Sequence, residues 1–126
     1  MESLLQALKR KSLLEEQFPI LRSGFDGLDG SPAILRRGAV SLLGARPGMG
    51  RSTLAAQIAT NVAEAGGRVG WFSTVRTNSE VVDKILRVKP ALLYPQSIAL
   101  EDRIGDIREL RLAIIKSGKQ SDLVVI

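Results

Sequence analysis

A glycine-rich turn between an apolar run and an amphipathic helical pattern constrains the fold of this chain more than any other feature. Residues 39–43 (Ala-Val-Ser-Leu-Leu) form a short apolar run, which predicts a buried strand. Residues 44–50 carry three glycines, and residues 52–65 then show helical periodicity up to Gly66-Gly67. The apolar face of this helix is expected to contain Leu54, Ala55, Ile58 and Val62. The order strand, turn, helix predicts one unit of an α/β fold.

The same alternation continues towards the C-terminus. Residues 68–73 predict a second buried strand that places Trp71 and Phe72 in the core. Residues 77–80 (Thr-Asn-Ser-Glu) match a capping box for a helix that ends before Pro90. Three further segments follow: an edge strand and then a loop within 91–100, a helix over 101–117, and a short apolar run typical of a buried parallel strand at 122–126. Alternating strands and helices predict a parallel sheet with helices on both faces.

Composition excludes several kinds of chemistry. The chain of 126 residues has no Cys and no His, so it cannot form a disulfide, a Cys/His zinc site or a Ser-His-Asp triad. No apolar run reaches the roughly 18 residues of a membrane span, and we expect no membrane contact and a cytoplasmic location. The net charge of +5 suits a nucleic-acid partner. The basic residues are spread along the chain, however, and aromatic residues are few, so no DNA site can be assigned.

The first 17 residues predict a polar-rich helix with Leu4, Leu5 and Leu8 on one face. Residues 12–15 match a capping box that could restart a second short helix, and Pro19 makes continuation unfavourable. This stretch has too little apolar surface to fold alone. We therefore divide the chain into a helical segment at 1–18, which must dock on its own domain or on a neighbouring subunit, and a nucleotide-binding domain at 19–126.

The turn itself has the features of a phosphate-binding loop. Small residues let successive backbone N–H groups surround phosphate oxygens, and the helix that follows adds its positive end. Measured against G-x-x-x-x-G-K-[ST], Ser52 occupies the position of the hydroxyl that ligates Mg²⁺. The predicted nucleotide-binding residues are Ala45, Arg46, Pro47, Gly48, Met49, Gly50, Arg51, Ser52 and Thr53. The expected ligand is ATP or ADP with Mg²⁺ held through Ser52.

Two positions of this loop depart from the pattern. Ala45 stands at the first glycine, a mild change because Gly44 precedes it. Arg51 stands at the lysine that reaches the β- and γ-phosphates, and its longer, forked guanidinium is expected to misplace the γ-group. A glycine-rich connection that binds no ligand remains the alternative.

The loop and the residues before it resemble the RecA-like motor domain of DnaB-type replicative DNA helicases. Residues 24–29 (Gly-Phe-Asp-Gly-Leu-Asp), Arg37-Gly38 and residues 45–50 (Ala-Arg-Pro-Gly-Met-Gly) carry the resemblance. It implies a RecA-like P-loop fold whose sheet is incomplete at Ile126, the residue before the expected Walker B aspartate. It also implies that residues 1–18 correspond to a linker helix that packs on an adjacent subunit, in a homo-oligomer or on other helicase subunits.

The resemblance also implies that this chain lacks catalytic residues that the family has. The family has a glutamate after the second strand that polarises the attacking water, and Val75 stands there in this chain. With Arg51, Val75 and no Walker B aspartate, we expect no measurable ATPase activity from this chain alone. Two alternatives stay open: a non-catalytic relative that acts through subunit or partner binding, and a RadA- or KaiC-like member of the same superfamily.

Four acidic residues could be imagined as acid or base groups, but we predict structural roles for them. Glu80 fits the capping box. The other three fit the early turns of the predicted helix over 101–117, where negative charge is favourable: Glu101, Asp102 and Asp106.

Overall fold

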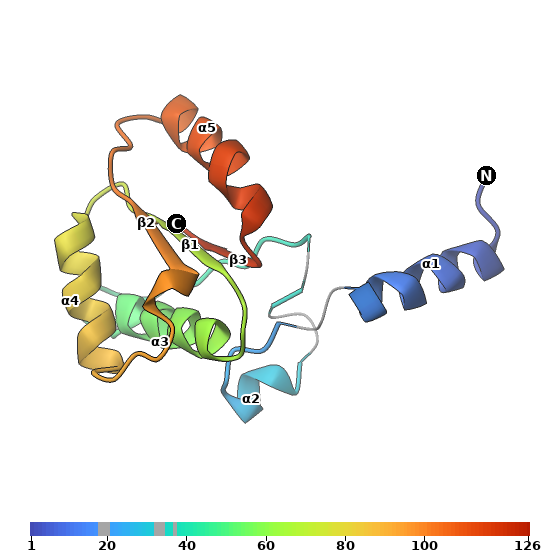
Figure 1. The fold of residues 1–126 in the computed structure, drawn as a ribbon, viewed down its shortest axis with the longest axis horizontal. Coiled ribbons are helices and arrows are strands. Elements are labelled where there is room, and N and C mark those ends of the chain that lie inside the picture. The colour runs from blue at the N-terminus through green and yellow to red at the C-terminus, as the bar shows by residue number, and fades with distance from the viewer. Residues whose placement is uncertain (18–20, 32–34, 37) are drawn as a thin grey trace.

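A computed structural model describes residues 1–17, 21–31, 35–36 and 38–126 of the chain. Pro19 and Arg37, which the sequence argument used, lie outside the described residues. The α/β class is confirmed, because a small parallel sheet carries helices on its two sides (Figure 1).

The sheet has three parallel strands in the order β2-β1-β3. Strand β1 (Val69–Phe72) lies in the centre, with β2 (Ile98–Glu101) on one side and β3 (Leu123–Val125) on the other. Val69 is in register with both Ile98 and Leu123. All four residues of β1 are buried, because a neighbour covers each of its edges and helices cover its faces. The predicted strands at 68–73 and 122–126 are confirmed.

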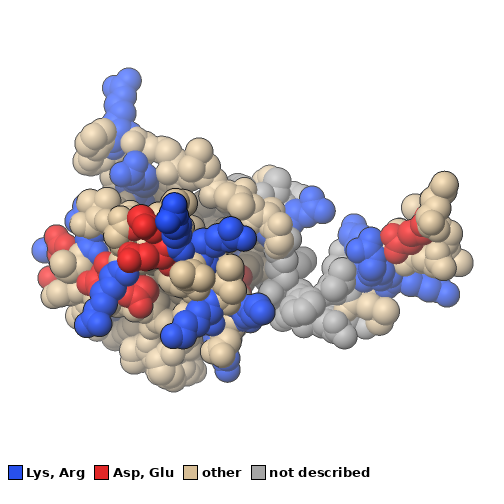
Figure 2. All heavy atoms as spheres, turned by 90° about the horizontal axis from the view of Figure 1, so that it is seen from above, with Lys and Arg blue, Asp and Glu red and all other residues tan. Residues whose placement is uncertain are grey.

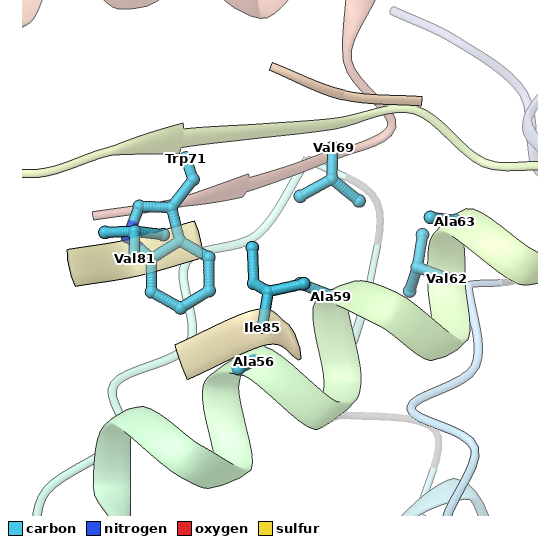
Figure 3. Close-up of a cluster of buried hydrophobic side chains, with 8 residues drawn as sticks. All are labelled: Ala56, Ala59, Val62, Ala63, Val69, Trp71, Val81 and Ile85. Atoms are coloured by element: carbon cyan, nitrogen blue, oxygen red, sulfur yellow. The ribbon is translucent and has the colours of Figure 1, made fainter. Parts of the chain in front are cut away.

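Helices α3 (Arg51–Glu64) and α4 (Asn78–Val88) pack on one face of the sheet, and α5 (Ile107–Ser117) lies on the other (Figure 1). Small residues on α3 allow a close approach, since Ala56 and Ala59 are completely buried. Figure 3 shows Ala56 near Trp71 and Val62 near Val69, so α3 runs antiparallel to β1. The core of this face is completed by two residues of α4, Val81 and Ile85.

The capping box at the start of α4 is confirmed. The Thr77 hydroxyl accepts a hydrogen bond from the Glu80 backbone N–H at 3.3 Å, and the Glu80 carboxylate accepts one from the Thr77 N–H at 2.8 Å. Asp102, just after β2, accepts a further bond from the Asn78 N–H at 2.6 Å. Three backbone N–H groups at this end of the helix therefore bond to side chains of the protein itself.

The predicted strand over residues 39–43 is wrong. The segment has no strand conformation, and the side chains of Val40 and Leu42 are 98% and 97% exposed. An apolar run becomes a strand only where a neighbouring strand bonds to its backbone and a packed layer covers its side chains. Within the part of the chain that the structure describes, the sheet consists of β1, β2 and β3, and residues 39–43 do not join it.

Three other boundaries differ from the predictions. Residues 4–17 form one continuous helix, α1 (Leu4–Gln17), without a restart at Ser12. The edge strand predicted at the start of segment 91–100 lies at its end instead. Strand β2 follows a short 3₁₀ helix, η1 (Pro95–Ser97), and includes Glu101. Helix α5 therefore starts at Ile107, where the Asp106 carboxylate accepts hydrogen bonds from the N–H groups of Arg108 and Glu109 at 2.8 Å. Asp106 is favoured as a cap because its short side chain reaches the free N–H groups.

Helix α1 extends away from the rest of the protein in Figure 1. We call it the N-terminal arm. Its leucines at positions 4, 5, 8 and 13 are largely exposed, with Leu4 at 78% and Leu8 at 55%. An apolar stripe left in solvent on a helix is unfavourable, and exposed apolar patches are common where proteins contact one another.

Candidate phosphate-binding loop

The loop before α3 has an open, glycine-dependent backbone. Residues 47–50 form a turn in which the Met49 N–H donates to the Arg46 carbonyl at 3.2 Å. Gly48 and Gly50 have positive φ angles of 80° and 87°, a region that residues with a Cβ rarely adopt. A Cβ built on Gly44, Gly48 or Gly50 would meet no atom within 4 Å, so the loop borders open space.

The N-terminus of α3 is left open by its own cap. Gly50 is the N-cap residue and provides no side-chain hydrogen bond. The first turn of α3, all of which the structure describes, contains no acidic residue. The first N–H groups of the helix and its positive end therefore face outward without a carboxylate to neutralise them. Arg46 and Arg51 are exposed and add positive charge. An anion is the natural partner of such an arrangement.

The predicted site residues lie together on this one turn and the first turn of α3. Ser52 is half-buried and Thr53 is exposed, while Met49 is 72% exposed and contributes its backbone rather than packing. The donor set fits a phosphate, because it consists of backbone N–H groups, a guanidinium and a hydroxyl. Among the described residues no group of three Asp or Glu side chains is placed to hold a metal ion by itself. A divalent cation would be held here through phosphate oxygens and the Ser52 hydroxyl.

The loop lies at the carboxyl end of the sheet. Because α3 runs antiparallel to β1, its N-terminus is beside the end of β1 that carries Trp71 (Figure 3). Ligands of open α/β sheets bind outside the carboxyl ends of the strands. The fold therefore brings the glycine loop to the edge where the segment after β1 also begins.

That segment places Val75 in solvent. Ser73 is fixed, since its N–H donates to the Glu101 carbonyl at 2.8 Å and its hydroxyl accepts from the Arg76 N–H at 2.9 Å. The Val75 side chain between them is 91% exposed. A valine cannot accept a proton, so this position provides no general base.

Charges of both signs mix on the surface. Figure 2 shows Lys and Arg interspersed with Asp and Glu on the visible face rather than gathered in one patch. This distribution gives no continuous path for a nucleic-acid backbone on that face. None of the helices in the described ranges is both long enough and apolar enough to cross a membrane.

Comparison with known proteins agrees with this geometry. A family model described as the DnaB-like helicase C-terminal domain matches residues 21–120, which include the glycine loop, α3 and strands β1 and β2. The chain belongs to this family. The match confirms the RecA-like helicase motor class suggested by the loop and by residues 24–29.

A curated relative of this DnaB-like domain carries a helicase name. The chain is 36% identical over 67 residues to a "Probable plasmid replicative DNA helicase" of Chlamydia psittaci. The aligned region covers 52% of this chain but only 15% of that protein. No solved structure matches the chain.

Sequence reasoning missed one set of polar contacts, between the third turn of α3 and residues 23–29. Asn61 on α3 bonds to the backbone of Ser23, 38 residues earlier, and Asp29 bonds to Ser23 as well. Asp29 belongs to the glycine-containing segment at 24–29 that carried the resemblance, which was the available signal. Nothing in the local sequence around Asn61 identifies it as the partner.

Proposed function

We propose that residues 45–53 bind the phosphates of ATP or ADP, as part of a helicase motor of the DnaB-like type. The observation that carries the proposal is the open N-terminus of α3 after a loop with two glycines of positive φ. Membership of the helicase family and the likeness to a plasmid replicative helicase support the same ligand. The activity and partners of a whole helicase remain part of the proposal, since the chain covers 15% of that relative.

Four positions of the loop and of the first turn of α3 have specific roles in this proposal. The backbone N–H groups around Gly48 and Gly50 donate to phosphate oxygens, and the end of α3 adds favourable electrostatic energy. Arg51 contributes a charged, forked donor, and the Ser52 hydroxyl faces the cation that accompanies the nucleotide. Mg²⁺ would reduce the repulsion between the phosphates when it is bound.

Hydrolysis is expected to be impaired although binding is retained. Phosphoryl transfer depends on a cation that reaches the γ-phosphate and on a group that orients the attacking water. Arg51 changes the first, and Val75, exposed at the end of β1, removes the second. General-base catalysis contributes about 10²–10⁴-fold, so the loss of this carboxylate, together with the altered cation at Arg51, should lower turnover towards background.

Binding of a fluorescent ADP analogue with Mg²⁺ to the full chain tests the site. Arg51→Ala removes a charge-assisted bond and should weaken binding about 10–100-fold, corresponding to roughly 1.5–3 kcal/mol. Arg87→Ala, on an exposed arginine in the last turn of α4, is the matched control and should leave affinity unchanged. Equal affinity of Arg51→Ala and the wild type for the ADP analogue would show that Arg51 does not bind the nucleotide.

Phosphate release from ATP tests the second part of the proposal. We expect no turnover above the rate of a blank without protein. Turnover that purified protein shows and that Ser52→Ala abolishes would overturn the proposed impairment.

Subunit docking through residues 1–18 is a second candidate function, and the exposed leucines of the N-terminal arm favour it. The partner is a second copy of this chain or another helicase subunit. Light scattering of the wild type and of Leu5→Ser/Leu8→Ser measures the effect. A drop in mass in the double variant supports self-association, whereas equal masses leave a different subunit as the partner to be sought by co-purification with the intact helicase.

A further inference from the structure

The chain folds a short turn around the carboxylate of Asp29. One oxygen of Asp29 accepts hydrogen bonds from the Ser23 N–H at 2.7 Å and the Ser23 hydroxyl at 2.9 Å. The other accepts from the Gly24 N–H at 3.1 Å. Ser23 is completely buried, although the neighbouring residues are exposed. The turn includes helix α2 (Asp26–Asp29) and is closed by a charged acceptor, which makes its bonds stronger than neutral ones.

Asn61 connects this turn to α3. Its side-chain amide donates to the Ser23 carbonyl at 2.8 Å, and its oxygen accepts from the Gln57 side chain at 3.2 Å. The bond from Gln57, one turn earlier on α3, fixes the orientation of the amide. Both backbone polar groups of Ser23 therefore have side-chain partners, and one of these partners belongs to the helix that follows the phosphate-binding loop.

Gly24 lets the turn come this close to α3. It has a φ of +84°, and a Cβ at this position would overlap the nitrogen of the Asn61 amide. Contacts this short do not occur, so any side chain would push the turn off α3. Only glycine fits at position 24, because the Asn61 side chain occupies the space that a Cβ would need.

We propose that Asp29, Ser23 and Asn61 form a clasp that ties residues 23–29, which follow the N-terminal arm in the sequence, to the phosphate-loop helix, with Asn61 as its positioning residue. The arm precedes the clasp in sequence, and α3 runs from the loop to Asn61. Closure of the clasp needs an intact third turn of α3, and a ligand at the N-terminus of α3 stabilises that helix. Nucleotide and clasp therefore favour each other, and this coupling rests on the proposed nucleotide binding.

Limited digestion of the full chain with trypsin reports on the clasp. Cleavage after the exposed Arg22 requires the adjoining Ser23 to leave its buried position, and mass spectrometry identifies the 1–22 fragment. Asn61→Asp keeps the shape of the side chain but replaces the donor with a charged acceptor facing the Ser23 carbonyl. Release of the fragment should become about five- to tenfold faster, as expected for one lost hydrogen bond.

Glu64→Gln is the matched control on the same helix. It changes one side-chain atom, removes the charge paired with Lys89 at 2.8 Å, and does not touch the clasp. Release of the 1–22 fragment should match that of the wild type. If Asn61→Asp is cleaved no faster than Glu64→Gln, the clasp is wrong.

The coupling between nucleotide binding and the clasp is measured by adding ADP with Mg²⁺ to each protein before digestion. Fragment release should slow in the wild type and in Glu64→Gln, and slow much less in Asn61→Asp. If calorimetry shows that ADP binds the wild type while its cleavage after Arg22 stays the same, the coupling is overturned. If ADP does not bind at all, the proposed nucleotide function fails, and with it the coupling, while faster release from Asn61→Asp still supports the clasp.

Gly24→Ala provides a second route if Asn61→Asp does not fold. The added methyl group meets the Asn61 side chain and should also speed release of the fragment. Adding Asn61→Ala to Gly24→Ala should cost less than the sum of the two single changes, because both act on one contact. Simple additivity would show that the two residues do not act together.

Discussion

Two successive segments of this chain have the same layout, an apolar run, a short loop and a helix, but they differ in how the helix begins. In the second unit, β1 is fully buried, and Thr77, Glu80 and Asp102 bond to the first N–H groups of α4. In the first unit, residues 39–43 are exposed, and α3 begins at Gly50 without a side-chain cap. A capped helix uses its free N–H groups within the protein, whereas a glycine loop leaves them for a ligand.

The apolar runs show that composition alone does not make a strand. Val40 and Val69 are the same residue type in runs of similar length, yet they are 98% and 1% exposed. Val69 has strand neighbours on both sides and helix α3 beneath it, whereas Val40 lies outside the sheet. The partners of a strand, which come from distant parts of the sequence, decide its burial.

The largest expected difference comes from placing the same charge in each run. Val69→Asp buries a carboxylate between α3 and two strands and should destabilise the protein by more than about 4 kcal/mol, enough to unfold it. Val40→Asp should change the free energy of unfolding by no more than about 0.5 kcal/mol. Urea unfolding followed by circular dichroism measures both. A severe loss in Val40→Asp would show that residues 39–43 are buried in solution, and the contrast between the two runs would disappear.

The same contrast explains which parts of the fold could be predicted from sequence. The capping box at 77–80 and the helix after the glycine loop are local signals, and both are confirmed. The predicted apolar face of α3 is wrong in part: only its Val62 is buried, because the small residues Ala56, Ala59 and Ala63 form the buried face instead. The residue pattern locates the glycine loop, in which Gly48 and Gly50 have positive φ, and its use as a phosphate site stays a prediction. By contrast, the strand at 39–43 depended on distant partners, and Asn61 pairs with a residue 38 positions away. Local patterns carry no information about either.

The two units also differ in how much space surrounds their glycines. A Cβ on Gly70 in β1 would lie 2.9 Å from the Ser121 hydroxyl and 3.1 Å from the ring of the buried Phe72. Gly70→Ala should therefore cost about 1–2 kcal/mol through overpacking. Gly44→Ala meets nothing within 4 Å and should be neutral or stabilise slightly by restricting the unfolded chain. Thermal unfolding compares the pair, and an equal loss in both would contradict the open loop.

Changing the two helix starts should separate stability from anion binding. Thr77→Ala removes the cap of α4 and should cost about 1 kcal/mol without affecting the affinity for ADP. Gly50→Ala forces a side chain into a φ of +87° and should cost about 1–2 kcal/mol, with weaker ADP binding as well. Unfolding and binding are measured on the same preparations. Loss of ADP affinity in Thr77→Ala, or unchanged ADP affinity in Gly50→Ala, would contradict the proposal that the start of α3, and not that of α4, binds the anion.

The smallest expected effect is a dependence of stability on pH, which of the two helix starts only that of α4 should show. Hydrogen bonds from the Thr77 backbone and hydroxyl lower the pKa of Glu80 below its ordinary value near 4.5. Its ionised form is thus favoured by folding, so this stabilisation is fully present above that value and is lost as pH falls through the lowered pKa. Bonds from Ser23 and Gly24 outweigh desolvation and lower the pKa of Asp29 as well, so the wild type loses stability from both groups.

Glu80→Gln isolates the contribution of the capping box to this acid dependence. The amide oxygen can still accept from the Thr77 N–H but does not titrate, so the variant should lose less stability than the wild type between pH 7 and pH 3. Residues 44–53 contain no carboxylate, and the start of α3 adds no such dependence. Unfolding midpoints across this range measure the difference. Parallel curves for the wild type and Glu80→Gln would show that the charge of Glu80 does not stabilise α4, and its cap would then act through neutral hydrogen bonding, independent of pH.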